Sequence, residues 1–73
     1  MKYKVILHKE EGGSYSVTVP ALSGCCSQGA TWEEAIVNSR EAIECHIESM
    51  KKDGEPIPLD ENFYLNEVEV AVG

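Results

Sequence analysis

Residues 20–38 read PALSGCCSQGATWEEAIVN, and this stretch decides the fold. Pro20 cannot donate a hydrogen bond to a strand ladder, so it ends the strand before it. Thr31 and Glu34 have the spacing of a capping box, in which the threonine side chain caps the first helical turn and the glutamate reaches back to the Thr31 amide. The stretch therefore predicts a chain that leaves a sheet and enters a helix.

Small residues fill the connection inside this stretch. Gly24 and Gly29 suit tight turns, and residues 25–28 have the length of a short strand. Cys25 is expected to be a small buried residue. Asn38 lies one turn into the helix, where its side chain is placed to bond the preceding loop.

Two alternating segments precede the proline. In residues 2–9 the side chains alternate, with Tyr3, Val5 and Leu7 on one face, and residues 14–19 alternate in the same way. Residues 10–13 read Glu-Glu-Gly-Gly, and the glycine pair supplies the positive φ that a hairpin turn needs. We therefore expect two strands paired as an antiparallel hairpin.

After Thr31 the apolar residues recur at helical spacing. The stripe consists of Trp32, Ile36, Ile43, Ile47 and Met50. Ser39 interrupts the stripe and, with Ala35, is small enough to let a sheet approach the helix closely. Lys51 and Lys52 favour a helix C-terminus, and Gly54 is a natural residue to follow it.

Downstream of the helix, Pro56 and Pro58 indicate an extended connection over residues 55–62. Residues 63–72 predict a last strand with one acidic, solvent-facing side, because their side chains alternate. One side carries Val68, Val70 and Val72, and the other carries Glu67, Glu69 and Ala71. The order β-β-β-α-β, with one helix on one face of an antiparallel sheet, predicts an α+β two-layer fold forming a single domain over residues 1–73.

Length and charge restrict the class of protein. A chain of 73 residues buries only about 60% of the surface of its unfolded state, and partner subunits are the usual source of additional stability for such a chain. A net charge of −7 argues against direct nucleic-acid binding and against an anionic membrane surface. The N-terminus has no signal peptide and no apolar run approaches the length of a membrane helix, so we expect a cytoplasmic protein.

The negative charge is concentrated near the end of the chain. Residues 53–73 contain no base and six acids, namely Asp53, Glu55, Asp60, Glu61, Glu67 and Glu69. A patch of one sign steers a partner of the opposite sign, although acidic loops also keep small domains soluble.

Metal binding and catalysis find little support in the pattern. Cys25 and Cys26 are adjacent and point apart, and the chain has no Cys-x-x-Cys or His-x-x-x-His pair, so we expect no metal site and take Cys25 and Cys45 as small buried residues. A nucleophile and its base could be formed by Cys26 or Ser27 with His46, but the sequence around these residues has no motif of such a site. We therefore assign no catalytic residue and no cofactor. The sequence also lacks the basic stripe and the stacking aromatic side chains that RNA binding requires.

The segment from Tyr15 to Ile43 resembles the HicB family of antitoxins. The resemblance rests on Pro-x-Leu-x-Gly-Cys from Pro20 and Gly-x-Thr-x-Glu-Glu-Ala-x-x-Asn from Gly29. The motif residues with structural roles are Pro20, Gly24, Cys25, Gly29, Thr31, Glu34, Ala35 and Asn38. The layout is similar to the family's N-terminal domain, which is likened to a partial ribonuclease H fold.

The resemblance implies an antitoxin role in a type II toxin–antitoxin system. HicB antitoxins bind HicA, a small basic ribonuclease that cleaves mRNA, and cover its active site. From charge we predict that such a partner contacts Asp60, Glu61, Glu67 and Glu69. Longer family members add a C-terminal DNA-binding domain, which this chain is expected to lack. The alternative is an orphan HicB-like domain that forms a homo-oligomer and has a non-toxin binding role.

Overall fold

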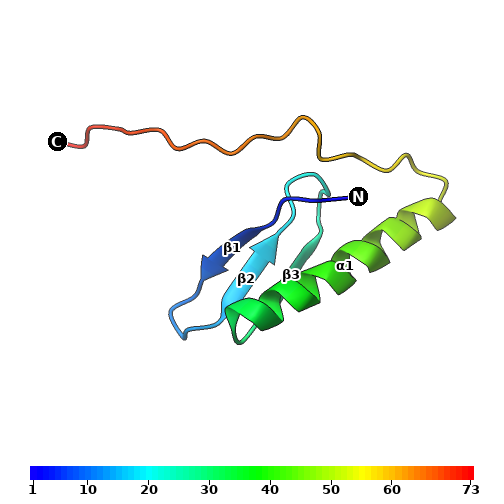
Figure 1. Ribbon diagram of the computed structural model, residues 1–73, viewed down its shortest axis with the longest axis horizontal. Coiled ribbons are helices and arrows are strands. Elements are labelled where there is room, and N and C mark those ends of the chain that lie inside the picture. Colours follow the sequence, from blue (N-terminus) through cyan, green and yellow to red (C-terminus); the bar gives the residue numbers. More distant parts are fainter.

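The computed structural model describes residues 1–73 and contains three strands and one helix (Figure 1). The elements are β1 (Ile6–Lys9), β2 (Tyr15–Thr18), β3 (Cys26–Gly29) and α1 (Trp32–Lys52). The strands form one antiparallel sheet in the order β1-β2-β3, and α1 packs chiefly against β3 and β2. The predicted α+β two-layer class is therefore confirmed.

β1 and β2 form the expected hairpin. Leu7 lies opposite Val17, and the turn closes through a bond from the Gly13 amide to the Glu10 carbonyl at 2.9 Å. Gly13 has a φ of 92°, the positive value that the glycine pair was predicted to supply. The first strand is regular from Ile6 rather than from residue 2, since the chain turns after Val19 and offers no strand opposite the earlier residues.

The turn between β2 and β3 carries the centre of the core. Val19, Leu22 and Cys25 form a buried cluster, and the Val19 amide donates to the Cys25 carbonyl at 3.2 Å. Gly24 adopts a φ of 80°, as a tight turn requires. The partly buried side chains packed against this cluster are Tyr3, Val5, Ala42, Ile43, Ile47 and Met50.

The helix approaches β3 most closely at Gly29. A Cβ atom on Gly29 would lie 2.7 Å from the Ala35 Cα, and Ala35 is fully buried. The φ of Gly29 is not positive, so the residue serves close backbone packing and not the tight turn that the sequence predicted. Ser39, one turn further along α1, is also buried and donates to the Ile36 carbonyl at 2.7 Å.

Both ends of α1 are capped by the residues that the sequence indicated. The Glu34 amide donates to Thr31 Oγ1 at 3.1 Å, whereas Glu34 Oε1 accepts from the Ala30 amide at 3.4 Å instead of the Thr31 amide. At the other end, Gly54 has a φ of 70° and its amide donates to the Lys51 carbonyl. No helix of the structure combines the length and the apolar character needed to cross a membrane.

The last strand predicted over residues 63–72 is absent from the structure. No residue after Glu55 takes part in a backbone–backbone hydrogen bond, and every residue from 61 to 73 is exposed. Figure 1 shows this part of the chain, in yellow to red, running the length of the molecule without joining the sheet. Alternating side chains favour a strand, but a strand forms only when another strand pairs with it. Within this chain no strand of the sheet pairs with residues 63–72.

Replacing Gly29 with alanine should lower the free energy of unfolding by about 2–3 kcal/mol, because the new methyl group overlaps the backbone of α1. Urea denaturation followed by circular dichroism measures the change. Gly12→Ala is the matched control, since a Cβ at Gly12 meets nothing within 4 Å. An equal loss in both variants would show that the close approach at Gly29 does not limit the fold.

Candidate functional site

The nucleophilic and metal-binding side chains do not converge in the structure. No group of three His, Cys, Asp or Glu side chains lies close enough together to hold a metal ion. Burial, and then the charge of neighbouring Cys26, raises the pKa of the Cys25 thiol, which disfavours the reactive thiolate. Cys45, predicted to be buried, is exposed because it lies on the face of α1 turned away from the sheet.

The motif residues lie between the end of β2 and the second turn of α1, partly in the turns and partly in β3 and α1 themselves. Pro20, Gly24 and Cys25 shape the turn that leads into β3. Asn38 Nδ2 donates to the Gln28 carbonyl at 2.8 Å, so it joins α1 to β3 itself and not to a loop. These positions give the motif a role in holding the helix on the sheet.

Asp60, in the segment that follows α1, bonds to the N-terminal residues of the chain. The Asp60 Oδ2 atom accepts from the Lys4 amide at 2.8 Å and from Lys4 Nζ at 3.1 Å. The Tyr3 hydroxyl donates to the Pro58 carbonyl at 2.6 Å. Asp60, predicted to face a partner, is therefore bonded within the chain, with 7% of its side chain exposed.

Two opposing effects set the charge of Asp60. Burial, the largest single effect, favours the neutral acid, but the hydrogen bonds from the Lys4 amide and ammonium group and the Lys4 charge together outweigh it. The pKa of Asp60 is consequently held below its usual range. Its second oxygen, Oδ1, is buried without a hydrogen-bond partner.

Beyond this attachment, residues 61–73 form what we call the C-terminal segment. Its three carboxylates, on Glu61, Glu67 and Glu69, are exposed and take part in no ion pair within the chain. Its large apolar side chains are exposed as well, namely Phe63, Tyr64, Leu65, Val68, Val70 and Val72. The structure thus leaves three of the four predicted contact residues free, on a segment that also carries an uncovered apolar side.

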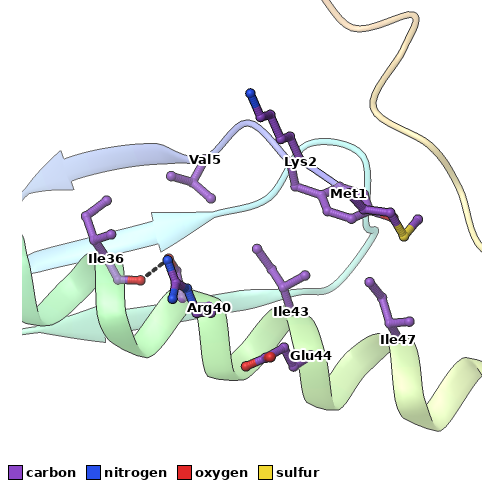
Figure 2. A pocket seen from close by; sticks show the side chains of 10 residues that line it. Met1, Lys2, Val5, Ile36, Arg40, Ile43, Glu44 and Ile47 are labelled. Atoms are coloured by element: carbon purple, nitrogen blue, oxygen red, sulfur yellow. Dashed lines mark hydrogen bonds between the residues drawn. The ribbon is translucent and has the colours of Figure 1, made fainter.

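A groove with a volume of about 670 Å³ opens between the N-terminal residues and α1 (Figure 2). Figure 2 shows Val5 pointing toward Ile36 and Ile43 across this space. The lining residues are Met1, Lys2, Tyr3, Val5, Ile36, Ser39, Arg40, Ile43, Glu44 and Ile47. None of them belongs to a strand of the sheet; those from the N-terminus lie in residues 1–5, which lead directly into β1. Sequence reasoning missed this groove, although the stripe of isoleucines on α1 was its signal.

Comparison with known families gives one extensive match. The family described as HicB_like antitoxin of bacterial toxin-antitoxin system matches residues 3–70. The chain belongs to this HicB-like antitoxin family. The match includes the motif residues and most of the C-terminal segment, so the resemblance inferred from the motif is confirmed.

Individual relatives agree with this membership. A UPF0150 protein of Thermoplasma acidophilum is 57% identical over 60 residues, covering 82% of this chain and 87% of the relative. Antitoxin HicB 1 of Photorhabdus laumondii is 37% identical over 59 residues, which are 81% of this chain and 38% of that antitoxin. The chain thus spans well under half the length of the relative that is named as an antitoxin.

The fold also has a solved counterpart. The crystal structure of the N-terminal domain of the Burkholderia pseudomallei antitoxin HicB matches with a TM-score of 0.73 and 41% identity, over 81% of this chain and 69% of that one. The sheet and the helix of this chain therefore have the fold of a HicB N-terminal domain. Family membership supports an antitoxin role with a toxin as partner.

Replacing Asp60 with asparagine should release the end of the chain, because the Lys4 amide loses a charged acceptor. Amide hydrogen exchange at Lys4 should become at least several-fold faster than in the unsubstituted chain. Asp53→Asn, at an exposed aspartate at the end of α1, is the control and should leave this exchange unchanged.

The same contact should depend on pH in a defined direction. Since folding lowers the pKa of Asp60, its stabilisation is complete above the pKa of the unfolded chain and disappears as the pH falls through the folded value. Protection of the Lys4 amide from exchange should therefore persist as the pH falls below the usual pKa of an aspartate, and should be lost only when the pH falls below the lowered pKa of Asp60. A titration by NMR that places Asp60 at or above an ordinary aspartate would contradict the contact.

Proposed function

We propose that this chain is the antitoxin of a HicA-type mRNA-cleaving ribonuclease and inhibits that enzyme by covering its active site. The observation that carries the proposal is the C-terminal segment, which presents Glu61, Glu67 and Glu69 without a cation of the same chain beside them. Family membership supplies the class of partner, a toxin, and the charge favours a basic one.

A ribonuclease that binds mRNA needs a basic surface to hold phosphates, and an acidic segment is complementary to such a surface. In an extended chain, residues two apart lie on the same side and about 6.7 Å from each other. Glu67 and Glu69 therefore form a short row of negative charge. Inhibition by occlusion requires no catalytic group of the antitoxin, and the proposed site of action is the cytoplasm, where mRNA is translated.

The second candidate is a HicB-like domain that forms a homo-oligomer and binds something other than a toxin. The uncovered apolar side chains of the C-terminal segment favour it, because a monomer gains nothing from exposing Val68, Val70 and Val72. The two candidates differ in whether a basic ribonuclease recognises the chain.

Co-expression separates these candidates. A short basic reading frame beside the gene for this chain should arrest growth when expressed alone, and co-expression of this chain should restore growth. The purified pair should form a complex in which cleavage of an mRNA substrate is blocked. Absence of such a reading frame, or a toxin that neither binds this chain nor is relieved by it, would contradict the antitoxin proposal and favour the second candidate.

Reversing the charge of the C-terminal segment should disturb toxin binding. Glu67→Lys together with Glu69→Lys should weaken toxin binding about tenfold or more, mainly through slower association, and should reduce the sensitivity of binding to salt. Surface plasmon resonance at two salt concentrations measures both effects.

The matched control reverses two exposed charges on α1, Glu41→Lys with Glu48→Lys, which gives the same net charge at another place. An equal loss of affinity in the control would show that net charge alone matters and that the C-terminal segment is not the contact.

A further inference from the structure

The molecule exposes more surface than a compact chain of its mass. Its accessible surface is 5899 Å², whereas a compact monomer of 8.0 kDa exposes about 4500 Å². The excess is larger than the roughly 800 Å² that each partner contributes to a standard protein interface. The radius of gyration of 14.4 Å likewise exceeds the value of about 11 Å for a compact chain of this length.

The C-terminal segment, every residue of which is exposed, contributes to this excess. Val68, Val70 and Val72 are 78%, 71% and 90% exposed and share one side of the extended chain. The backbone groups of the segment form no hydrogen bonds with other backbone groups. An extended segment with one apolar side and unpaired backbone groups is a strand that lacks a sheet.

The domain has a place of matching character at β1. β1 is an edge strand, so one of its sides has unpaired backbone groups. The groove lies between α1 and residues 1–5, which lead directly into β1, and Val5, Ile43 and Ile47 contribute to its apolar lining (Figure 2). A strand added beside β1 would pair with the free backbone groups and cover the groove with its apolar side.

The chain's own segment is badly placed to do this. The Asp60 carboxylate is bonded to the Lys4 amide, so the segment starts beside residue 4. If it continued along β1 at the same rise per residue, Leu65 would reach Lys9, where β1 ends. Val68, Val70 and Val72 would then extend past the end of the strand and stay uncovered. A second chain is needed to cover them.

We propose that residues 63–72 of one copy form a fourth strand along the free edge of β1 in a second copy, with Val68, Val70 and Val72 seated in the groove. Because the same segment and the same groove occur in both copies, reciprocal exchange closes a two-fold dimer with no free segment left over. The inference does not depend on the identity of any toxin.

Charge supports a second copy as the occupant. Lys2 and Lys9 lie along this edge and form no ion pair within the chain, whereas Lys4 is already paired with Asp60. The groove itself is lined by one base, Arg40, beside one acid, Glu44, in addition to Lys2. The C-terminal segment is wholly acidic among its charged residues, so the two surfaces attract each other. Glu67 and Glu69 lie on the side opposite the valines and remain exposed in the exchanged strand.

The decisive experiment mixes two differently labelled preparations of the unsubstituted chain, one with carbon-13 and one without. Isotope-filtered NMR should show contacts between valine methyl groups of one chain and isoleucine methyl groups of the other, assigned to the C-terminal segment and to Ile36, Ile43 or Ile47. Contacts found only within one chain, or a strict monomer by sedimentation equilibrium at every concentration, would overturn the proposal.

A pair of variants makes the test independent of labelling. Val68→Asp with Val70→Asp should raise the dimer dissociation constant more than about a hundredfold, since each exchanged strand loses two buried valines. The helical circular dichroism should be unchanged, because these residues lie outside the core. Glu67→Gln with Glu69→Gln, on the opposite side, should leave the dimer intact. Equal effects of the two pairs would contradict the assigned faces.

The same variants keep this inference separate from the toxin proposal. If the chain is monomeric and Val68→Asp with Val70→Asp abolishes binding of a ribonuclease toxin, the toxin is the occupant of the valine face and the exchange is wrong. If the chain is a dimer that no toxin binds, the exchange stands and the antitoxin proposal fails.

Discussion

The backbone contact between Gly29 and Ala35 is the constraint on which the rest of the domain depends. It brings α1 onto β3 so closely that a side chain at residue 29 has no room. The small buried residues Ala35 and Ser39 continue this contact along one face of the helix. Around it the chain places its caps at Thr31 and Glu34, and the Asn38 bond to β3 fixes the helix against the sheet.

This placement has a consequence for the opposite side of the molecule. Because α1 packs chiefly against β3 and β2, it leaves a groove between itself and residues 1–5, which precede the edge strand β1. The chain then crosses back past residues 3 and 4, is held there by Asp60, and continues as a segment with no partner in the chain. The fold therefore has an unpaired edge strand and an extended segment without backbone partners. Both features are available to bind another chain.

The sequence predicts the parts of this fold that depend on local chemistry. The hairpin glycines, the proline after β2, the capping residues and the helix end all act on their immediate neighbours, so their positions were predicted closely. The role of Gly29 was not, because close packing between β3 and α1 depends on tertiary geometry. Cys45 was misplaced for a related reason, since helical spacing alone did not show which side of α1 the sheet would occupy. The prediction of a last strand was wrong because alternation gives a preference for pairing without giving the partner.

Of the four predicted contact residues, Glu61, Glu67 and Glu69 are free. The fourth, Asp60, is bonded to Lys4, which is far from it in sequence, so no local pattern indicated this bond.

Membership of the HicB-like antitoxin family supports an antitoxin role for this chain, and we propose that its acidic segment recognises a basic ribonuclease. Carbodiimide labelling of carboxylates, followed by mass spectrometry, tests that claim directly on the unsubstituted chain. When the purified toxin is added, labelling of Glu67 and Glu69 should fall sharply, while labelling of Glu41 and Glu48 on α1 should stay the same. Protection of the α1 carboxylates with continued labelling of Glu67 and Glu69 would contradict the account.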